Sequence, residues 1–232
     1  MKIRSKICGM TRAEDAILAA KLGADAIGLI FFSGSKRCVS IEQAQAITQC
    51  IPPFVTVVGL FVNAATTEVQ EVLRYVPLDV LQFHGDENAE FCRQFQRPYI
   101  KAIRVGDTAD IEAAAATYTD ARALLFDAAV AGQYGGTGQT FDWQMLPDRL
   151  DIPWILSGGL KPENIALAIR QSKAMAIDVS SGVEASPGIK DEQKMRARRL
   201  ELPRSKSDHK ILSLARLPFR HARSTFNTIT QN

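Results

Sequence analysis

The stretch WILSGGLKPENIALAIRQSKAMAIDVSSGVE, from Trp154 to Glu184, decides the fold. It contains two short apolar runs, separated by a helical pattern that opens near Pro162, and proline is favoured in a first helical turn. This order predicts two parallel strands joined by a crossover helix. Both runs end in small residues, which are Gly158 and Gly159 after the first run and Ser180, Ser181 and Gly182 after the second.

The small residues after the two runs indicate a phosphate site. The carboxyl ends of parallel strands meet at one edge of a sheet, where backbone N–H groups can bind an anion. In a closed α/β barrel, the loops after strands 7 and 8 frequently bind phosphate. The alternative is two ordinary tight turns, which need glycine for positive φ.

The alternation of apolar runs and amphipathic segments extends along most of the chain. We expect strands near residues 3–8, 25–31, 55–62, 79–84, 99–105, 123–128, 153–157 and 175–180. We expect helices near residues 12–22, 41–50, 65–75, 87–96, 109–118, 141–149, 162–171 and 190–200. Eight such units predict an α/β fold, a single (β/α)8 TIM barrel. A doubly wound sheet, the rival, would carry a glycine-rich fingerprint after its first strand, where this chain has Cys8-Gly9-Met10-Thr11.

Some expected helices carry signals for their ends. A capping box has Ser or Thr followed three residues later by Glu or Gln. The N-caps expected from side-chain chemistry are Thr11 with Glu14, Ser40 with Gln43, and Thr140. Gly23 is the expected C-terminal stop of the first helix.

Charge divides the chain in two. Residues 196–232 hold nine Lys/Arg and two Asp/Glu, whereas residues 1–195 are mildly acidic. We therefore expect a catalytic barrel domain at 1–202 and an irregular basic C-terminal tail at 203–232, which is disordered because it is polar and weakly periodic. A binder of anionic surfaces and a frame-shifted end are the alternatives for the tail.

Composition also bounds the class of protein. The acidic main domain argues against a nucleic-acid partner. No apolar run approaches the length of about 18 residues typical of a membrane span, and the N-terminus lacks a signal-peptide pattern. The four cysteines lack disulfide-framework or metal-site spacing, so we expect a cytoplasmic protein.

Two side chains at expected strand ends could exchange protons with a substrate. Cys8 ends the first strand, and it is either a structural cysteine or a base whose thiolate Lys6 favours from the same face. Asp127 ends the apolar sixth strand, and it is either an ion-pair partner of Lys6, Lys101 or Arg104 or a general acid.

Lys6 has a second expected partner. In a closed barrel strand 8 neighbours strand 1, and Lys6 and Asp178 each lie two positions before a candidate site residue on the same face. We therefore expect these two side chains to form an inward-facing pair.

Other residues are candidates for binding anionic groups. The loop at 33–37 is either solvated or a clamp in which Arg37 grips a carboxylate with two parallel bonds. The segment at 132–138 is rich in glycine, which suits close approach to a phosphate. His84 fits hydrogen bonding and positioning better than primary catalysis. No His, Asp or Glu group has metal-ligand spacing.

Together these motifs resemble the phosphoribosylanthranilate isomerase family over about residues 1–197. The motifs are Lys6-Ile7-Cys8-Gly9-Met10-Thr11, Gly28-Leu29-Ile30-Phe31-Phe32, Ser35-Lys36-Arg37, Leu81-Gln82-Phe83-His84-Gly85-Asp86, Leu125-Phe126-Asp127, Gly135-Gly136-Thr137-Gly138, Ser157-Gly158-Gly159-Leu160 and Asp178-Val179-Ser180-Ser181-Gly182-Val183-Glu184. The resemblance implies a (β/α)8 enzyme of tryptophan biosynthesis that performs an Amadori rearrangement without cofactor or metal.

The resemblance also implies roles for individual residues. Cys8 resembles the general base that removes the C2′ proton, and Asp127 resembles the general acid that protonates the ribose ring oxygen. Arg37 resembles the group that holds the anthranilate carboxylate, and His84 is a further substrate-binding residue. The implied phosphate cradle consists of Gly135, Gly136, Gly138, Gly158, Gly159, Ser181 and Gly182. The expected partner is a phosphorylated small molecule, bound by a monomer or homodimer.

The end of the chain departs from the family pattern and leaves rivals open. Arg198 and Arg199 stand where apolar residues are expected, and Pro203 should stop the last helix. An idle phosphate-binding barrel is one rival, against which Cys8 and Asp127 argue. The other is a histidine-pathway isomerase, whose family uses aspartates at strands 1 and 5.

Overall fold

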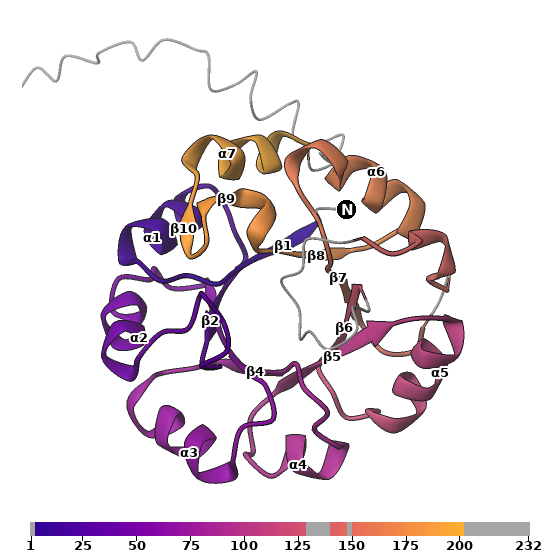
Figure 1. The fold of residues 1–232 in the computed structure, drawn as a ribbon, viewed down its shortest axis with the longest axis horizontal. Coiled ribbons are helices and arrows are strands. Elements are labelled where there is room, and N and C mark those ends of the chain that lie inside the picture. The colour runs from indigo at the N-terminus through magenta and orange to yellow at the C-terminus, as the bar shows by residue number, and fades with distance from the viewer. Residues whose placement is uncertain (1–2, 129–139, 148–149, 202–232) are drawn as a thin grey trace, which may run out of the picture. The chain divides into compact units, whose positions relative to one another are not determined.

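The computed structural model describes residues 3–128, 140–147 and 150–201 of the 232. In this part of the chain eight parallel strands close into a barrel in sequence order, with β1 paired to both β2 and β8 (Figure 1). The strands are β1 (Arg4–Cys8), β2 (Ala26–Ile30), β3 (Thr56–Phe61), β4 (Val80–Phe83), β5 (Tyr99–Val105), β6 (Ala123–Ala128), β7 (Trp154–Leu156) and β8 (Ala176–Val179). The predicted TIM barrel is confirmed.

Helices surround the barrel, as the ribbon in Figure 1 shows. They are α1 (Ala13–Lys21), α2 (Ile41–Thr48), α3 (Thr66–Tyr75), α4 (Ala89–Arg93), α5 (Thr108–Thr117), α6 (Pro162–Ser172) and α7 (Glu192–Glu201). The main apolar core lies between strands and helices, where outward-facing strand residues such as Ile7, Ile27 and Leu29 are fully buried. Because side chains alternate along a strand, the residues between them face the barrel interior.

The helix expected at 141–149 is wrong for the residues that the structure describes. They contain a single 3-10 turn, η1 (Trp143–Met145). Asp142, and not Thr140, caps this turn by accepting a hydrogen bond from the Gln144 N–H. Leu146 is extended, as the residue before a proline usually is, so the turn cannot continue into a helix.

The other helix-end predictions had mixed outcomes. The capping box of Ser40 and Gln43 is confirmed, with both reciprocal hydrogen bonds present. Gly23 follows α1 at φ +78°, as expected of a helix stop. Thr11 does not cap α1, because the helix begins one residue later with Arg12 at the N-cap position, and the Thr11 hydroxyl donates to the carbonyl of Gly188 instead.

The segment between β8 and α7 contains structure that the sequence patterns did not predict. A 3-10 turn, η2 (Ser181–Val183), leads into an antiparallel hairpin of β9 (Glu184–Ser186) and β10 (Ile189–Lys190). The Thr11 bond to Gly188 ties this hairpin to the loop after β1. The carboxyl end of β8 is therefore extended by a small sheet beside β1 (Figure 1).

The last described helix tolerates an unexpected residue. Arg198 is fully buried on α7, which packs against α1, α6 and η2. The arginine thus occupies a core-facing position without ending the helix. Pro203 and the tail predicted at 203–232 lie outside the described residues.

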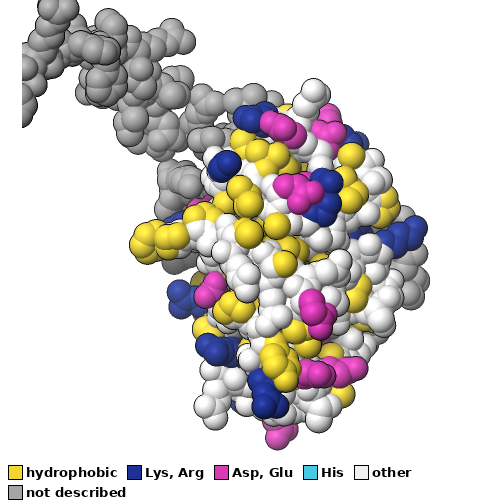
Figure 2. Space-filling model, turned by 90° about the vertical axis from the view of Figure 1, so that its left-hand side faces the viewer, with side chains coloured by type: hydrophobic (Ala, Val, Ile, Leu, Met, Phe, Trp, Pro, Cys, Tyr) yellow, Lys and Arg dark blue, Asp and Glu magenta, His cyan; other side chains and the backbone are white. Residues whose placement is uncertain are grey.

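The described surface fits the charge pattern of the main domain. On the face drawn in Figure 2, basic and acidic side chains are interspersed among neutral and apolar ones. No helix among the described residues is long and apolar enough to cross a membrane.

Candidate active site

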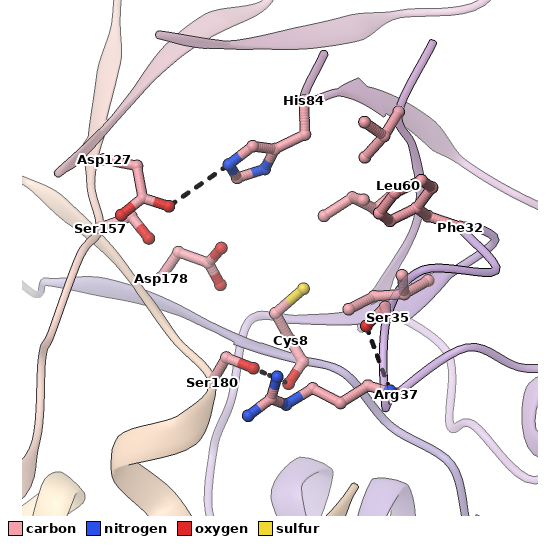
Figure 3. A pocket seen from close by; sticks show the side chains of 12 residues that line it. Cys8, Phe32, Ser35, Arg37, Leu60, His84, Asp127, Ser157, Asp178 and Ser180 are labelled. Carbon is pink, nitrogen blue, oxygen red and sulfur yellow. Dashed lines mark hydrogen bonds and ion pairs between the residues drawn. The ribbon is translucent and has the colours of Figure 1, made fainter. Parts of the chain in front are cut away.

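A pocket opens at the carboxyl ends of the strands, inside the ring of loops (Figure 3). Its cavity volume is about 70 Å³, and it is lined by Cys8, Ile30, Phe32, Ser35, Arg37, Leu60, Val62, His84, Asp127, Ser157, Asp178 and Ser180. Four of the predicted site residues, Cys8, Arg37, His84 and Asp127, therefore share one cavity. The glycines at 135, 136 and 138 lie outside the described residues.

Cys8 ends β1 with its sulfur in the pocket and is 4% exposed. The neighbouring strand makes room for it through Gly28, the register partner of Cys8. A Cβ at Gly28 would lie 2.7 Å from Cys8 Sγ and 3.0 Å from Lys6 Cε, which is too close for either contact. Glycine at position 28 is thus a condition for placing the cysteine.

The expected pair of Lys6 and Asp178 is confirmed. The two residues are register partners on β1 and β8, and Lys6 Nζ donates to Asp178 Oδ2 at 2.8 Å. Both side chains are about 5% exposed, so the pair is enclosed by the barrel. Burial disfavours the charged amine, but Asp178 and Cys8 outweigh this and raise the pKa of Lys6, so that it stays protonated.

The environment of Cys8 does not favour a thiolate at neutral pH, contrary to expectation. Burial raises the pKa of the Cys8 thiol, and the charge of Asp178 raises it further. Lys6 and Lys190 lower it without reversing the shift. The sequence prediction considered Lys6 alone, whereas the structure pairs that cation with a carboxylate.

Asp127 ends β6 and is 5% exposed. Its Oδ1 accepts a hydrogen bond from the Ala128 N–H at 2.9 Å, and its Oδ2 lies 3.3 Å from His84 Nε2. The three basic residues considered as its partners have other carboxylates, because Lys6 pairs with Asp178, Lys101 with Glu87 and Arg104 with Asp86. Asp127 therefore faces the cavity beside an imidazole.

His84 follows β4 and connects two polar side chains of the barrel. Gln82 Nε2 lies 3.0 Å from His84 Nδ1, while His84 Nε2 points to Asp127 (Figure 3). If the Gln82 amide donates to Nδ1, the neutral ring carries its proton on Nε2, toward Asp127. This arrangement agrees with the predicted positioning role.

The glycines after β7 meet the geometric demands of Asp127 and of a tight turn. Gly158 and Gly159 have φ values of +87° and +58°. A Cβ at Gly158 would lie 2.8 Å from Asp127 Oδ1 and from the Ala128 nitrogen. The tight-turn alternative thus holds for these two glycines, and Gly158 also leaves space for the carboxylate.

Gly182 is required by close packing between the loop after β8 and the residues before α6. A Cβ at this position would overlap the carbonyl of Leu160 and would lie 2.9 Å from Lys161 Cα. Gly182 and its neighbour Ser181, in the loop after β8, therefore approach the backbone at the start of α6 closely. Close packing between these two loops accounts for the glycine at 182, and the phosphate cradle stays a prediction.

Arg37 lines the pocket but already holds a protein carboxylate. Its Nε and Nη2 donate to Glu184 Oε1 and Oε2, both at 2.8 Å. These bonds to Glu184 outweigh desolvation and raise the pKa of Arg37. The arginine is thus fixed in direction by a residue of β9, which the simple picture of a basic loop did not include.

The described residues contain no cluster of three or more His, Cys, Asp or Glu side chains that could hold a metal ion.

A sequence profile of the family described as N-(5′-phosphoribosyl)anthranilate (PRA) isomerase matches residues 5–198. The chain belongs to this family. The protein is an aldose–ketose isomerase that isomerises N-(5′-phosphoribosyl)anthranilate in tryptophan biosynthesis.

Individual members of the PRA isomerase family support the assignment. The N-(5′-phosphoribosyl)anthranilate isomerase of Neisseria meningitidis serogroup B is 55% identical over 196 residues, which cover 84% of this chain and 94% of the relative. A crystal structure of a phosphoribosyl anthranilate isomerase in complex with reduced 1-(o-carboxyphenylamino)-1-deoxyribulose 5-phosphate is 39% identical, has a TM-score of 0.76 and covers 86% and 97% of the two chains.

A second solved structure concerns a monomeric form of the dimeric PRA isomerase from Thermotoga maritima. It is 38% identical to this chain with a TM-score of 0.76, and the similarity covers 86% of this chain and 97% of that one.

Two contributions to the pocket were not assigned from the sequence. Gly28 and Glu184 lie in quoted motifs, yet no role followed from their residue types. The available signal for Glu184 was a carboxylate two positions after the small residues Ser180, Ser181 and Gly182 that follow the last barrel strand. For Gly28 it was a glycine inside an apolar strand, which often marks a close approach.

Proposed function

We propose that Cys8 and Asp127 are the base and the acid of the Amadori rearrangement. In this mechanism Asp127 protonates the ribose ring oxygen and opens the ring, and Cys8 removes the proton from C2′. The observation that carries the proposal is that the two side chains enter one cavity from β1 and β6, which β7 and β8 separate. A sugar between them would present different atoms to each group.

The surroundings of Asp127 fix the direction of its carboxyl group. The carboxyl group is enclosed by β6, Gly158 and His84, and it keeps one hydrogen bond from the Ala128 N–H. The Ala128 N–H and the His84 ring each lie beside one carboxyl oxygen, which supports a fixed orientation of this group. Asp127 is then held for transfer to the substrate.

The raised pKa of Cys8 has two consequences for its role as a base. The thiolate that forms is a stronger base toward a carbon-bound proton, but only a small fraction of the enzyme carries it at neutral pH. Lys6 and Lys190 offset part of the cost of burial. Because Asp127 must be protonated while Cys8 is deprotonated, we expect the activity to pass through a pH optimum.

Two remote anions would orient the substrate between these groups. Arg37 is proposed to bind the anthranilate carboxylate through the guanidinium edge that Glu184 leaves open. The proposed phosphate cradle consists of Gly135, Gly136, Gly138, Gly158, Gly159, Ser181 and Gly182, together with the N-terminus of α6, whose dipole favours an anion. Fixing both ends of the substrate supplies orientation at its reacting carbons.

Further properties of the enzyme belong to the same proposal. We expect catalysis without a cofactor or metal, in the cytoplasm, by a monomer or a homodimer. The dimeric relative from Thermotoga maritima makes a homodimer the form to test first. Size-exclusion chromatography with light scattering at several protein concentrations distinguishes the two states.

The direct test of the proposed function is an activity assay on the purified protein. Adding it to phosphoribosylanthranilate should abolish the substrate's fluorescence, with the same rate before and after treatment with a chelator. A stable fluorescence signal would favour an idle phosphate-binding barrel. Turnover of the corresponding histidine-pathway substrate at a higher rate would favour the other rival.

A further inference from the structure

Glu184 occupies the centre of a buried charged cluster behind the pocket. It begins β9 and is 6% exposed, and it accepts hydrogen bonds from Arg37 and from Lys190. The Lys190 side chain has no exposed surface, and its Nζ lies 2.9 Å from Glu184 Oε1. One carboxylate therefore joins two cations, of which only Arg37 lines the cavity.

The bonds to Glu184 use one edge of the Arg37 guanidinium. A guanidinium has two edges that can each hold a carboxylate with two parallel hydrogen bonds. Glu184 takes the edge formed by Nε and Nη2. The edge formed by Nη1 and Nη2 is left for a second carboxylate, and its direction is set by the first pair.

Lys190 connects the same cluster to the base. Its Nζ donates to the carbonyl oxygen of Cys8 at 2.6 Å and to that of Ser180 at 3.3 Å, in addition to Glu184. Ser180 Oγ also donates to the Cys8 carbonyl at 3.1 Å. Glu184 and Lys190 thus hold Arg37 and the backbone of Cys8 in one network.

From this geometry we propose that Glu184 is a positioning residue for the substrate carboxylate, acting through Arg37. It fixes the guanidinium so that the open edge faces the carboxylate of the anthranilate ring. Lys190, which bonds both Glu184 and the Cys8 carbonyl, fixes the position of that edge relative to Cys8. Glu184 is shared between Arg37 and Lys190, so it does not belong to Arg37 alone. This inference rests on the proposed role of Arg37.

The charges of the cluster agree with this arrangement. Burial alone would raise the pKa of Glu184, but hydrogen bonds from Arg37 and the charge of Lys190 lower it below its usual value. The carboxylate is therefore ionised at neutral pH, as a fixed partner for two cations must be. A neutral side chain at position 184 would leave two like charges facing each other.

Binding of a pair of product analogues tests the proposal. One is the reduced product 1-(o-carboxyphenylamino)-1-deoxyribulose 5-phosphate, and the other is its phenylamino counterpart without the carboxylate. Glu184→Gln should weaken binding of the carboxylated analogue about tenfold, because the fork of Arg37 loses its fixed partner. Binding of the other analogue should not change. The exposed Glu192→Gln on α7 is the matched control and should bind both analogues as the unmodified protein does.

The double variant separates positioning from general support of the fold. If Glu184 acts through Arg37, the variant with Arg37→Ala and Glu184→Gln should bind the carboxylated analogue no more weakly than Arg37→Ala alone. Additive losses, or equal weakening of both analogues in Glu184→Gln, would overturn the proposal. If Glu184→Gln does not fold, Glu184→Asp keeps the charge with a shorter stem, and a selective loss for the carboxylated analogue remains the required result.

Arg37→Ala also separates the two levels of the argument. If it binds both analogues as tightly as the unmodified protein does, the proposed carboxylate role of Arg37 fails and the inference fails with it. If Arg37→Ala loses affinity only for the carboxylated analogue while Glu184→Gln loses none, the proposed function stands and the role of Glu184 is refuted.

Discussion

The two walls of the pocket hold their reactive groups by different means. The first wall surrounds Cys8, and its charged side chains are Lys6 on β1, Asp178 on β8 and Lys190 on β10. Around Asp127, between β4 and β6, the neighbours are an imidazole and a backbone N–H. Removing one member of a buried ion pair destabilises the whole fold because it leaves a charge without its partner, whereas replacing the Asp127 carboxyl by an amide does not break a Lys or Arg ion pair. Chemistry and stability are therefore coupled on the first wall and separable on the second.

The largest effect should be on stability, after a substitution that removes one partner of the buried pair of Lys6 and Asp178. Lys6→Met leaves Asp178 buried without its cation, and removing one partner of such a pair typically destabilises a fold by about 3–5 kcal/mol. Urea unfolding followed by circular dichroism measures the change. The control is Arg4→Met on the same strand, since Arg4 pairs with Asp25 at the surface and an exposed pair contributes at most about 1 kcal/mol. Equal losses in the free energy of unfolding for Lys6→Met and Arg4→Met would contradict the claim that the buried pair beside Cys8 stabilises the fold.

A substitution of Asp127, on the second wall, should lower the activity of the enzyme without lowering its stability. Asp127→Asn keeps the size of the side chain but removes the proposed acidic proton, so kcat should fall at least about 10²-fold, with little change in KM. Steady-state fluorescence assays and an unfolding curve measure both properties. Asp120→Asn, in the loop that precedes β6, should leave activity unchanged. An Asp127→Asn variant with near-normal kcat would remove this residue from the chemistry.

A smaller effect on catalysis is expected for Arg37, which is proposed to bind the substrate without transferring a proton. Arg37→Ala removes a charged hydrogen bond of roughly 1.5–3 kcal/mol, so KM should rise by about 10- to 150-fold while kcat changes less. Arg93→Ala on the exposed surface of α4 is the matched control. Unchanged KM and kcat in Arg37→Ala would exclude this arginine from the site.

The smallest effect should follow removal of the tail. A chain that ends after Leu202 keeps all eight strands and the described part of α7, so activity and solubility should stay nearly intact. The full-length protein, assayed in parallel, is the reference. An insoluble or inactive truncated protein would show that the barrel domain extends past the boundary that we expect.

The strands and the positions of the reactive residues could be read from the sequence, because both follow from local periodicity and from strand ends. Cys8 and Asp127 ended apolar runs, and alternation along neighbouring strands correctly paired Lys6 with Asp178. The 3-10 turn at Trp143 was missed because the proline that stops it was given too little weight.

Contacts between distant loops could not be predicted in the same way. The pairing of Arg37 with Glu184 joins residues that are 147 positions apart through an unpredicted hairpin. The raised pKa of Cys8 depends on burial and on Asp178 as well as on Lys6, so no single neighbour in the sequence determines it. Such properties arise only when the barrel closes.

The measurement that tests the central claim most directly is the pH dependence of kcat and kcat/KM for Cys8→Ser and for the unmodified enzyme, by single-turnover and steady-state fluorescence. In the unmodified enzyme kcat/KM should pass through a pH optimum, since Cys8 acts only when deprotonated and Asp127 only when protonated. The folded Cys8→Ser variant should lose at least about 10²-fold in kcat, and the limb of the pH profile that Cys8 contributes should change. Near-full kcat in the folded variant would show that the base lies elsewhere and would contradict the proposed mechanism.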